Sequence, residues 1–215
     1  MTTSPNIPQV WKADFIYDLP LGSGHWLLGN AGGTLQKIVS GWQVSGTSRI
    51  QSGDPIDLGN VRLVGMTRKD VQQALNLRFD DDARRVYSMP ADIILNTNRA
   101  NNVSITGVGG YSNQGIPEGR YIAPANSRDC LEHYDGDCGA SSVVVYGPRF
   151  IVFDLAASKR TRITEKIDFE VRAEMFNAFN NTNFTVGLTN FATTFGQVTA
   201  ADGARTVQLT GRINF

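Results

Sequence analysis

Five segments of the chain alternate between apolar and polar residues with a period of two, and this feature constrains the fold most. Such a period is typical of a β-strand whose two faces meet different surroundings. The segments are Gln9 to Leu19, Gly41 to Gln51, Arg149 to Ile163, Lys166 to Phe179 and Arg205 to Phe215. The sequence therefore predicts an all-β protein with about five long antiparallel strands.

The alternation alone fits two classes of β-protein. A soluble sheet turns its apolar face toward a core and its polar face toward water. A strand of an outer-membrane barrel turns its apolar face toward lipid, and it needs about 9–11 residues to cross the bilayer. Each of the five segments is long enough for the second class, so the lengths of the connections must separate the two.

The connections favour the membrane class. The third and fourth segments are joined by a minimal turn near Thr164–Glu165, and the first and second by the Gly-rich link from Pro20 to Ser40. Residues 52–148 and 180–204 are much longer connections. Outer-membrane barrels have short periplasmic turns and long extracellular loops. With the C-terminus placed in the periplasm, both long loops fall outside the cell and both shorter links fall inside, which predicts an up-and-down barrel topology.

Aromatic residues occur near both ends of the five segments. Girdles of aromatic side chains mark the two membrane interfaces of a barrel, although aromatic residues are also enriched in ordinary strands. The expected periplasmic ends carry Tyr17, Trp42 and Phe215, and the expected extracellular ends carry Trp11, Phe150, Phe153 and Phe179.

Composition excludes several other classes. Lys+Arg and Asp+Glu are both 20, so the net charge is zero, whereas proteins that bind nucleic acid usually carry a basic excess. The sequence has no run of about 18 apolar residues that would predict a transmembrane helix. The first residues do not have the pattern of a signal peptide, so we expect an export signal upstream of Met1.

Several segments resemble the C-terminal part of large TonB-dependent receptors, the type that often carries an N-terminal carboxypeptidase-regulatory-like domain. The stretch Asp14–Pro20 and the glycines after it are similar to a "Y-x-L-P-F-G" segment. Gly41–Gly46 with Gln51–Pro55 resembles "GWQ-x-SG…SG-x-P", and Gly147–Arg160 is similar to the next strand of the family. Arg172–Phe184 resembles "R-x-E-x-FN-x-FN-x-x-NF".

This resemblance implies that residues 1–215 are the C-terminal part of an outer-membrane β-barrel. About five strands give only a partial barrel, because the smallest barrels use about eight. The implied partners are outer-membrane lipid, the rest of the barrel with its plug domain, TonB through the N-terminal part, and the barrel-assembly machinery. The implied function is import of a scarce nutrient, and the alternative is a structural or adhesive β-rich surface protein that does not transport.

A row of charged residues occupies one face of the expected strands. The structural interpretation is that these residues line the lumen and form ion pairs between neighbouring strands. The alternative is that they guide a substrate or take part in acid–base chemistry. The expected lumen-facing residues are Arg49, Arg160, Arg162, Asp168, Glu170, Arg172, Glu174 and Arg212. We find no catalytic, phosphate-binding or nucleotide-binding motif, so we expect neither an enzyme nor a cofactor.

Cys130 and Cys138 lie close together in the first long loop. In an extracellular loop such a pair predicts a disulfide. A metal site that includes His133, or two free thiols, are the alternatives, although the spacing fits no standard zinc motif. Between the cysteines, Asp135-Gly136-Asp137 indicates a turn more than a calcium loop, because the twelve-residue ligand pattern is absent.

Two further local features predict a helix start in the first long loop and an assembly signal at the end of the chain. Thr67 with Asp70 is typical of a capped helix start, so residues 67–79 predict a short helix inside the long loop. The chain ends on Phe215, with Ile213 two places earlier and Gln208 at the expected start of a barrel-ending pattern, which resembles an assembly signal. The family's glycine would fall at Thr210, whereas this chain has Gly211.

Overall fold

The computed structural model describes residues 7–22, 24–30, 32–104, 107, 110–125 and 141–215. It is mostly β, with antiparallel sheets. The chain divides into two compact units. The five-stranded unit comprises Val10–Gln51, Phe150–Thr182 and Gly203–Phe215, and the connecting unit comprises Met1–Gln9, Ser52–Arg149 and Asn183–Asp202.

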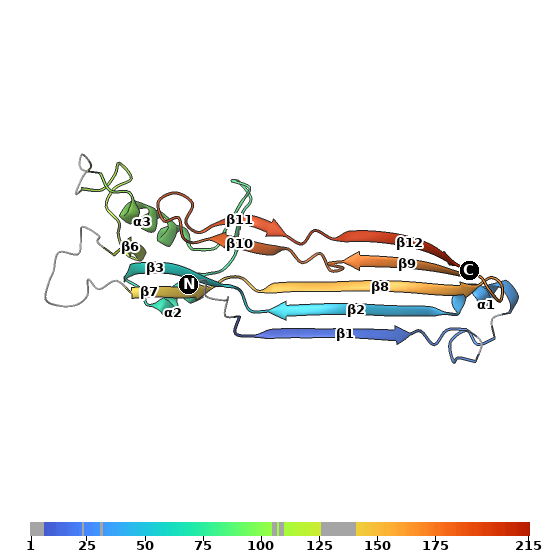
Figure 1. The fold of residues 1–215 in the computed structure, drawn as a ribbon. Coiled ribbons are helices and arrows are strands. Elements are labelled where there is room, and N and C mark those ends of the chain that lie inside the picture. Colours follow the sequence, from blue (N-terminus) through green and yellow to red (C-terminus); the bar gives the residue numbers. More distant parts are fainter. Residues whose placement is uncertain (1–6, 23, 31, 105–106, 108–109, 126–140) are drawn as a thin grey trace. The chain divides into compact units, whose positions relative to one another are not determined.

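The five-stranded unit is one antiparallel sheet whose strand order follows the sequence. The order is β1-β2-β8-β9-β12, as Figure 1 shows. The bounds are β1 Val10–Asp18, β2 Trp42–Gln51, β8 Phe150–Arg162, β9 Asp168–Phe176 and β12 Thr206–Asn214. Each strand corresponds to one of the five alternating segments, so the prediction of five sequential antiparallel strands is confirmed. The sheet is open, with β1 and β12 at its edges, and the described residues form no closed barrel.

One strand ends earlier than its alternating pattern suggested. The fourth segment runs to Phe179 in the sequence, but β9 ends at Phe176. Asn177 has a positive φ of 49°, which ends the extended conformation, and its carbonyl accepts a hydrogen bond from the backbone N–H of Asn180 at 2.8 Å. Asparagine tolerates this left-handed conformation better than most residues.

The short and long connections leave the sheet at opposite ends. The register places Asp18 beside Gln43 and Arg162 beside Asp168, so the 163–167 turn and the link before β2 lie at one end. The link contains a short helix, α1 (Gly33–Val39), which the sequence did not predict. The segments 52–149 and 177–205 both leave from the other end, as predicted.

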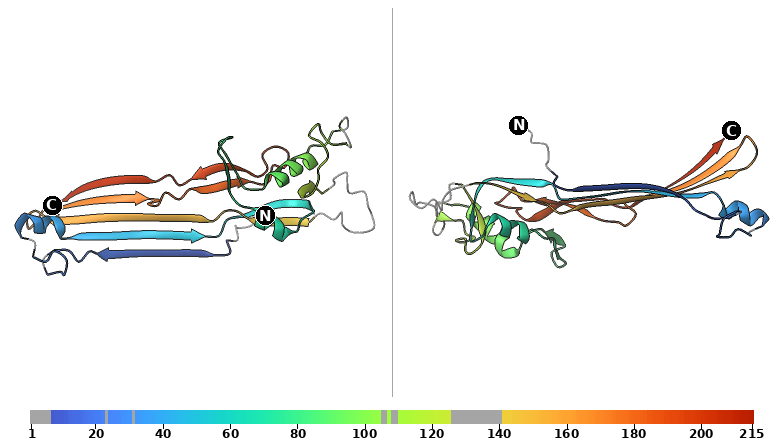
Figure 2. Two further views of the ribbon diagram at one scale, coloured as in Figure 1. Left: turned by 180° about the vertical axis from the view of Figure 1, so that it is seen from behind. Right: turned by 90° about the horizontal axis from the view of Figure 1, so that it is seen from below.

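Within its unit, the five-stranded sheet is a single layer. Figure 2 (right) shows it nearly edge-on, twisting and bending toward the end that carries the C-terminus. Because none of the unit's described elements lies over the strands, large apolar side chains stay open to the surroundings: Leu209 is 77% exposed and Phe15 49%. A sheet of this kind needs an apolar phase, or another layer, against that face.

The connecting unit contains the remaining strands, so the segments 52–148 and 180–204 are not plain loops. A three-stranded sheet has the order β6-β3-β7, from β3 (Pro55–Val64), β6 (Tyr121–Pro124) and β7 (Ser141–Tyr146). A four-stranded sheet has the order β10-β11-β5-β4, from β4 (Arg78–Asp80), β5 (Arg85–Tyr87), β10 (Asn183–Gly187) and β11 (Gln197–Asp202). Two helices, α2 (Arg68–Ala74) and α3 (Ala91–Asn101), complete the unit.

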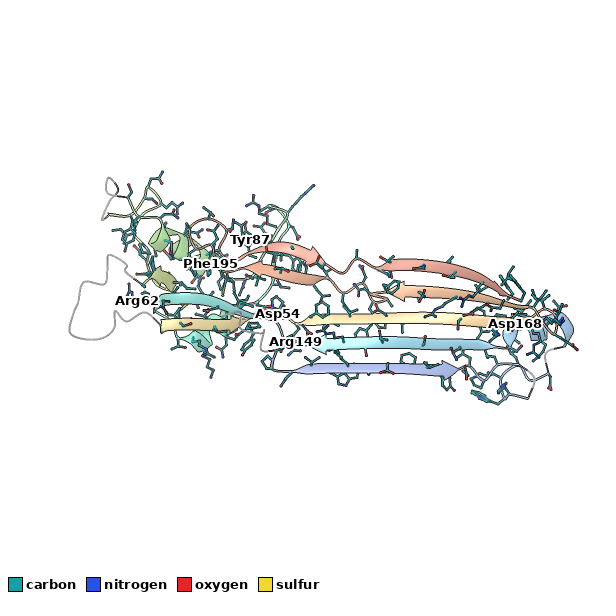
Figure 3. The ribbon with its side chains drawn as sticks, in the orientation of Figure 1. Asp54, Arg62, Tyr87, Arg149, Asp168 and Phe195 are labelled. Carbon is teal, nitrogen blue, oxygen red and sulfur yellow. The ribbon has the colours of Figure 1, made fainter. Side chains whose placement is uncertain are left out.

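A hydrophobic core holds the connecting unit together. Residues far apart in the sequence contribute to it, among them Val71 of α2, Ile93 of α3 and Phe195 of the second long connection. Phe195, labelled in Figure 3, has no exposed surface. The buried members of the cluster are Leu58, Val61, Val71, Met89, Ile93, Ile122, Val143, Val145, Leu188 and Phe195. Burial of this set makes the two long connections one folded body.

The helices also satisfy the edges of the three-stranded sheet. The side-chain amide of Gln72 in α2 donates to the carbonyl of Tyr146 at 3.0 Å, and its Oε1 accepts from the Tyr146 N–H at 2.8 Å. On β6, the N–H of Ile122 donates to Thr97 Oγ1 of α3 at 3.1 Å, and Asn101 Nδ2 donates to the Ile122 carbonyl at 2.9 Å. Side chains of the two helices thus form hydrogen bonds with backbone groups that an open sheet edge would leave available to another chain.

The predicted helix cap in the long connection is confirmed. Thr67 Oγ1 accepts from the Asp70 N–H at 3.3 Å, and Asp70 Oδ2 accepts from the Thr67 N–H at 2.8 Å. Hydrogen bonds from the backbone and the hydroxyl of Thr67 lower the pKa of Asp70 below its ordinary value of 3.8. The helix itself is shorter than the 67–79 pattern, because Leu75 leaves the helical conformation at the C-cap. Among the described helices, none is long and apolar enough to span a membrane.

Candidate functional site

The register of the five-stranded sheet gathers the expected lumen residues on one face. Directly opposed residues share a face, and the side chains of a strand alternate between faces. Arg49 lies opposite Val152, Arg160 opposite Glu170, and Glu170 opposite Arg212. By the same alternation, the whole set lies on this polar face: Arg49, Arg160, Arg162, Asp168, Glu170, Arg172, Glu174 and Arg212.

The polar face carries balanced charge. Besides those eight, register places Lys12, Asp14, Asp18 and Asp154 on it. Its cationic residues are Lys12, Arg49, Arg160, Arg162, Arg172 and Arg212, and its anionic residues are Asp14, Asp18, Asp154, Asp168, Glu170 and Glu174. This face is therefore charged along its length but neutral in total.

Asp168 forms ion pairs with two arginines on this face, and Figure 3 labels it at the end of the sheet that carries the 163–167 turn. Arg160 donates to Asp168 Oδ2 through Nε at 3.1 Å and through Nη2 at 2.5 Å. Arg162 Nε lies 3.8 Å from Asp168 Oδ1. The Asp168 side chain is 19% exposed, whereas those of Arg160 and Arg162 are 64% and 77% exposed. One carboxylate thus holds two arginines that remain accessible from the polar face.

The other expected lumen residues have different partners. Arg172 Nη2 lies 2.9 Å from Glu174 Oε1 on the same strand, two residues away on the same face. Arg49 lies over the ring of Phe150, 5.6 Å from its centroid, which is cation–π geometry. The register puts Arg49 on the same face as the other charged residues, and no pattern in the sequence indicated this aromatic partner.

The opposite face is apolar. It carries Trp11, Phe15, Tyr17, Trp42, Val44, Ile50, Ile151, Phe153, Leu155, Phe169, Val171, Met175, Val207, Leu209 and Ile213. In the five strands, Lys159 is the one charged residue on this face. A sheet with one charged and one apolar face, and no second layer in its own unit, is suited to separate an aqueous space from lipid.

Lys159 is placed near an end of this apolar face. Its ammonium donates to the carbonyl of Ser40, and it lies 5.7 Å from the centre of the Trp42 ring. Trp42 in turn donates its indole N–H to the carbonyl of Ile38 at 3.0 Å. Lysine and tryptophan side chains together are typical of a membrane interface, where the charged group can reach water.

Aromatic residues also meet at the opposite end of the sheet. Phe153 and Phe179 form an edge-to-face pair, with ring centres 5.2 Å apart. Trp11 lies opposite Ile50, next to the start of β1. Phe150 lies at this end too, but its register with Gln51 puts it on the polar face. The sequence therefore predicted that these aromatic residues lie near one end of the sheet, but it did not predict that Phe150 lies on the opposite face from Trp11 and Phe153.

The repeated Phe-Asn motif forms a clasp where β9 ends. Asp154 Oδ1 accepts a hydrogen bond from the Asn177 N–H at 2.8 Å. The Asn177 side chain, 4% exposed, donates from Nδ2 to the carbonyls of Asn181 and Gly203 and accepts from the Asn181 N–H at 3.0 Å. Asn180 Oδ1 accepts from the Arg205 N–H at 3.3 Å. These contacts hold the end of β9 beside the chain that enters β12.

A hollow of about 470 Å³ lies at the end of the sheet that carries α1. Asp18, Gln43, Arg160 and Glu170 line it together with His25 and other residues of the link. Gln43 Nε2 donates to Asp18 Oδ1 at 2.8 Å, so part of its polar lining is already paired. No sequence pattern indicated that His25 lies near this charged row.

The residues of the expected assembly signal lie on β12 or directly after it. Gln208 is opposite Glu174 on the polar face, and Ile213 is opposite Phe169 on the apolar face. Phe215 follows β12 and is 99% exposed. The expected disulfide of Cys130 and Cys138, and the Asp135–Asp137 turn with His133, lie outside the described residues.

The comparisons with known proteins identify a family and no individual relative. A family model described as an outer membrane beta barrel domain matches residues 2–208. That match spans nearly the whole chain, including both units. The comparison with curated proteins and the comparison with solved structures each gave no match.

Proposed function

Because the chain belongs to the outer membrane beta barrel domain family and is a protein of the cell outer membrane, we propose that it forms part of the wall of a TonB-dependent receptor that imports a scarce nutrient. In this proposal the polar face lines the lumen and the apolar face contacts lipid. The observation that carries it is the separation of charge between faces, to which Lys159 is the exception within the five strands.

The two open edges fit a larger barrel. β1 and β12 each have one neighbour in the sheet, so each leaves a row of backbone groups for a further strand. Strands from the rest of the barrel would pair there and close the wall. The connecting unit would then lie outside the cell, with α1 and the 163–167 turn in the periplasm, since long connections of outer-membrane barrels are extracellular.

The resemblance of four motifs to TonB-dependent receptors supports the transport part of the proposal. Asn177 and Asn180 belong to one of these motifs, and they form the clasp at the end of β9. A plug domain and a TonB-contacting segment would be contributed by the N-terminal part of the receptor. Energy from TonB would move the plug while the charged wall stays in place.

A pair of neighbouring cysteine substitutions tests the assignment of the faces. Glu170 and Val171 are adjacent in β9 and lie on opposite faces. In the receptor in outer membranes, Glu170→Cys should react with a water-soluble maleimide, whereas Val171→Cys should react only with a lipid-soluble one. Equal labelling of both by the water-soluble reagent would contradict a lipid-facing apolar surface.

Dependence on TonB separates transport from a structural or adhesive role. We expect the coding sequence upstream of Met1 to encode a plug domain and a TonB-contacting segment, and the purified receptor to retain the periplasmic domain of TonB on an affinity column. A signal peptide joined directly to these strands, with no retention of TonB, would favour the surface protein without transport.

A further inference from the structure

The connecting unit contains a pocket that the barrel wall does not explain. It has a volume of about 790 Å³ and lies between the β4–β5 hairpin and α3. β5 joins the four-stranded sheet through the pairing of Tyr87 with Gln197, and Figure 3 shows Tyr87 beside β11. The pocket is lined by Arg78, Phe79, Asp80, Asp81, Asp82, Tyr87, Met89, Ala91, Ile94, Leu95 and Asn98.

The floor of the pocket is apolar and firmly supported. Met89 is 1% exposed and belongs to the core of the unit, and Ile94 packs against the same core. Phe79 and Leu95 are 65% and 47% exposed, so they leave apolar surface open at the pocket. Phe79 is held from one side by Phe184, with ring centres 6.0 Å apart. An apolar floor of this kind favours a ligand with a hydrocarbon or aromatic body.

The polar groups of the pocket are mainly acceptors. Asp80 Oδ1 accepts from the Ala83 N–H at 2.9 Å, while Asp81 and Asp82 are exposed and join no ion pair among the described residues. Asn98 also lines the pocket, but its Oδ1 is buried from solvent, so the carboxylates supply the acceptor oxygens that a ligand can reach. These oxygens call for a ligand that donates hydrogen bonds and carries positive charge.

The basic residues nearby do not remove the preference of the pocket for a positively charged ligand. Arg78 lines the pocket, but its Nη1 already donates to the carbonyls of Ala74 and Asn76 at 3.2 and 2.8 Å. Arg84 and Arg85 belong to the same hairpin and are not part of the lining. The lining thus has three carboxylates and one arginine, which favours a cation over an anion.

A metal ion is the less suitable cation. Among the described residues, no group of three His, Cys, Asp or Glu side chains converges as metal ligands would. The carboxylates are consecutive in a turn, and one oxygen of Asp80 is occupied by the backbone. An organic ammonium group needs no such convergence, since it forms hydrogen bonds in several directions from one centre.

We propose that this pocket binds a small organic cation, with its ammonium group toward Asp81 and Asp82 and its apolar body over Leu95 and Phe79. The site goes beyond the proposed function, because it requires only that the connecting unit be folded, whether or not the barrel transports. The pocket volume exceeds what a single ring with a short amine chain needs, so larger amines of this class also fit.

A charge series of one ligand skeleton tests the proposal by calorimetry on the full-length protein in maltoside micelles. The ligands are 2-phenylethylammonium, neutral 2-phenylethanol and anionic phenylacetate, each with a blank titration into micelles. We expect binding of the ammonium compound, weakened by salt, and at least about fivefold weaker binding of the other two. No binding of the ammonium compound, or equal binding of all three, would overturn the proposal.

Matched variants locate the site. The double variant Asp81→Asn/Asp82→Asn should weaken binding of 2-phenylethylammonium by about fivefold, as expected for two partly exposed ion pairs. The control Glu165→Gln removes a carboxylate from the 163–167 turn and should leave affinity unchanged. Circular dichroism shows whether each variant is folded, and unchanged affinity in a folded Asp81/Asp82 double variant would place the ligand elsewhere.

Discussion

Gly46 is the position in the five-stranded sheet where a single added methyl group should have the largest effect. A Cβ there would lie 2.7 Å from Phe15 Cε1, 2.8 Å from Leu155 Cδ2 and 3.0 Å from the carbonyl oxygen of Asp154. Register puts Gly46 directly between Phe15 on β1 and Leu155 on β8. The two side chains can move apart, but the Asp154 carbonyl belongs to the backbone of the neighbouring strand and cannot.

The expected magnitude follows from two opposing effects. Overpacking of this kind costs about 1–3 kcal/mol. A Gly→Ala change restores about 0.4–1 kcal/mol by reducing the freedom of the unfolded chain. Gly46→Ala should therefore lower the free energy of unfolding by about 1–2 kcal/mol. Gly211→Ala is the matched control, because its Cβ would lie 3.8 Å from Phe169 Cε2, an ordinary contact distance, and it should be neutral or slightly stabilising.

Urea unfolding of the full-length protein in lipid vesicles, followed by tryptophan fluorescence, measures both variants. Adding Phe15→Leu to Gly46→Ala should recover part of the loss, because it removes the nearest obstructing atom. Wild-type stability of Gly46→Ala would refute the close packing at this position. An equal loss in Gly211→Ala would show that the effect comes from the substitution and not from the space around it.

Three other predictions concern the C-terminal residue, the cap of α2 and the cysteine pair. Deleting Phe215 should reduce the amount of heat-modifiable barrel in the outer membrane, whereas Phe215→Tyr should not, because an aromatic anchor at the interface is kept; normal amounts without it would exclude an assembly role. Because hydrogen bonds from Thr67 lower the pKa of Asp70 in the folded protein, the ionised carboxylate stabilises α2 above about pH 3.8. This stabilisation is lost as the pH falls through the lowered pKa of the folded state. Hydrogen exchange of the α2 amides should therefore differ between wild type and Asp70→Ala at neutral pH, and the difference should disappear in acid. The pairing of Cys130 with Cys138 predicts a cross-linked peptide in a non-reduced digest, and two alkylated free thiols would exclude it.

The five long strands could be predicted because each carries its own periodic signal over at least nine residues. The faces followed from the same signal, including the positions of Arg160 and Glu170. The end of β9 was misjudged, because the apolar pattern continues past Asn177 while its left-handed backbone stops the strand. Such a turn is a property of the backbone that periodicity does not record.

The connecting unit could not be predicted in the same way. Its strands β4 and β5 have three residues each and β6 has four, which is too short for a period to be recognised. Its sheets pair residues far apart in the sequence, such as Tyr87 with Gln197. The pocket between the β4–β5 hairpin and α3 depends on this non-local pairing, so no local pattern in the sequence indicated a site at Asp80–Asp82.

In the proposed barrel wall, Trp42 and Lys159 would set the depth of the sheet in the membrane. Since Lys159 is the charged residue on the apolar face, its ammonium must remain near water, and its contacts with Ser40 and Trp42 place it at the interface. From Trp42 to Ile50 the apolar face then runs for about 27 Å along β2, at ~3.4 Å per residue. With the tilt of about 35–45° usual in barrels, this covers about 20 Å of the roughly 25 Å apolar band, and the aromatic pair of Phe153 and Phe179 lies close to where the band must end. The apolar stretch of β2 is therefore about 5 Å shorter than the band, so residues just beyond its end must complete the crossing.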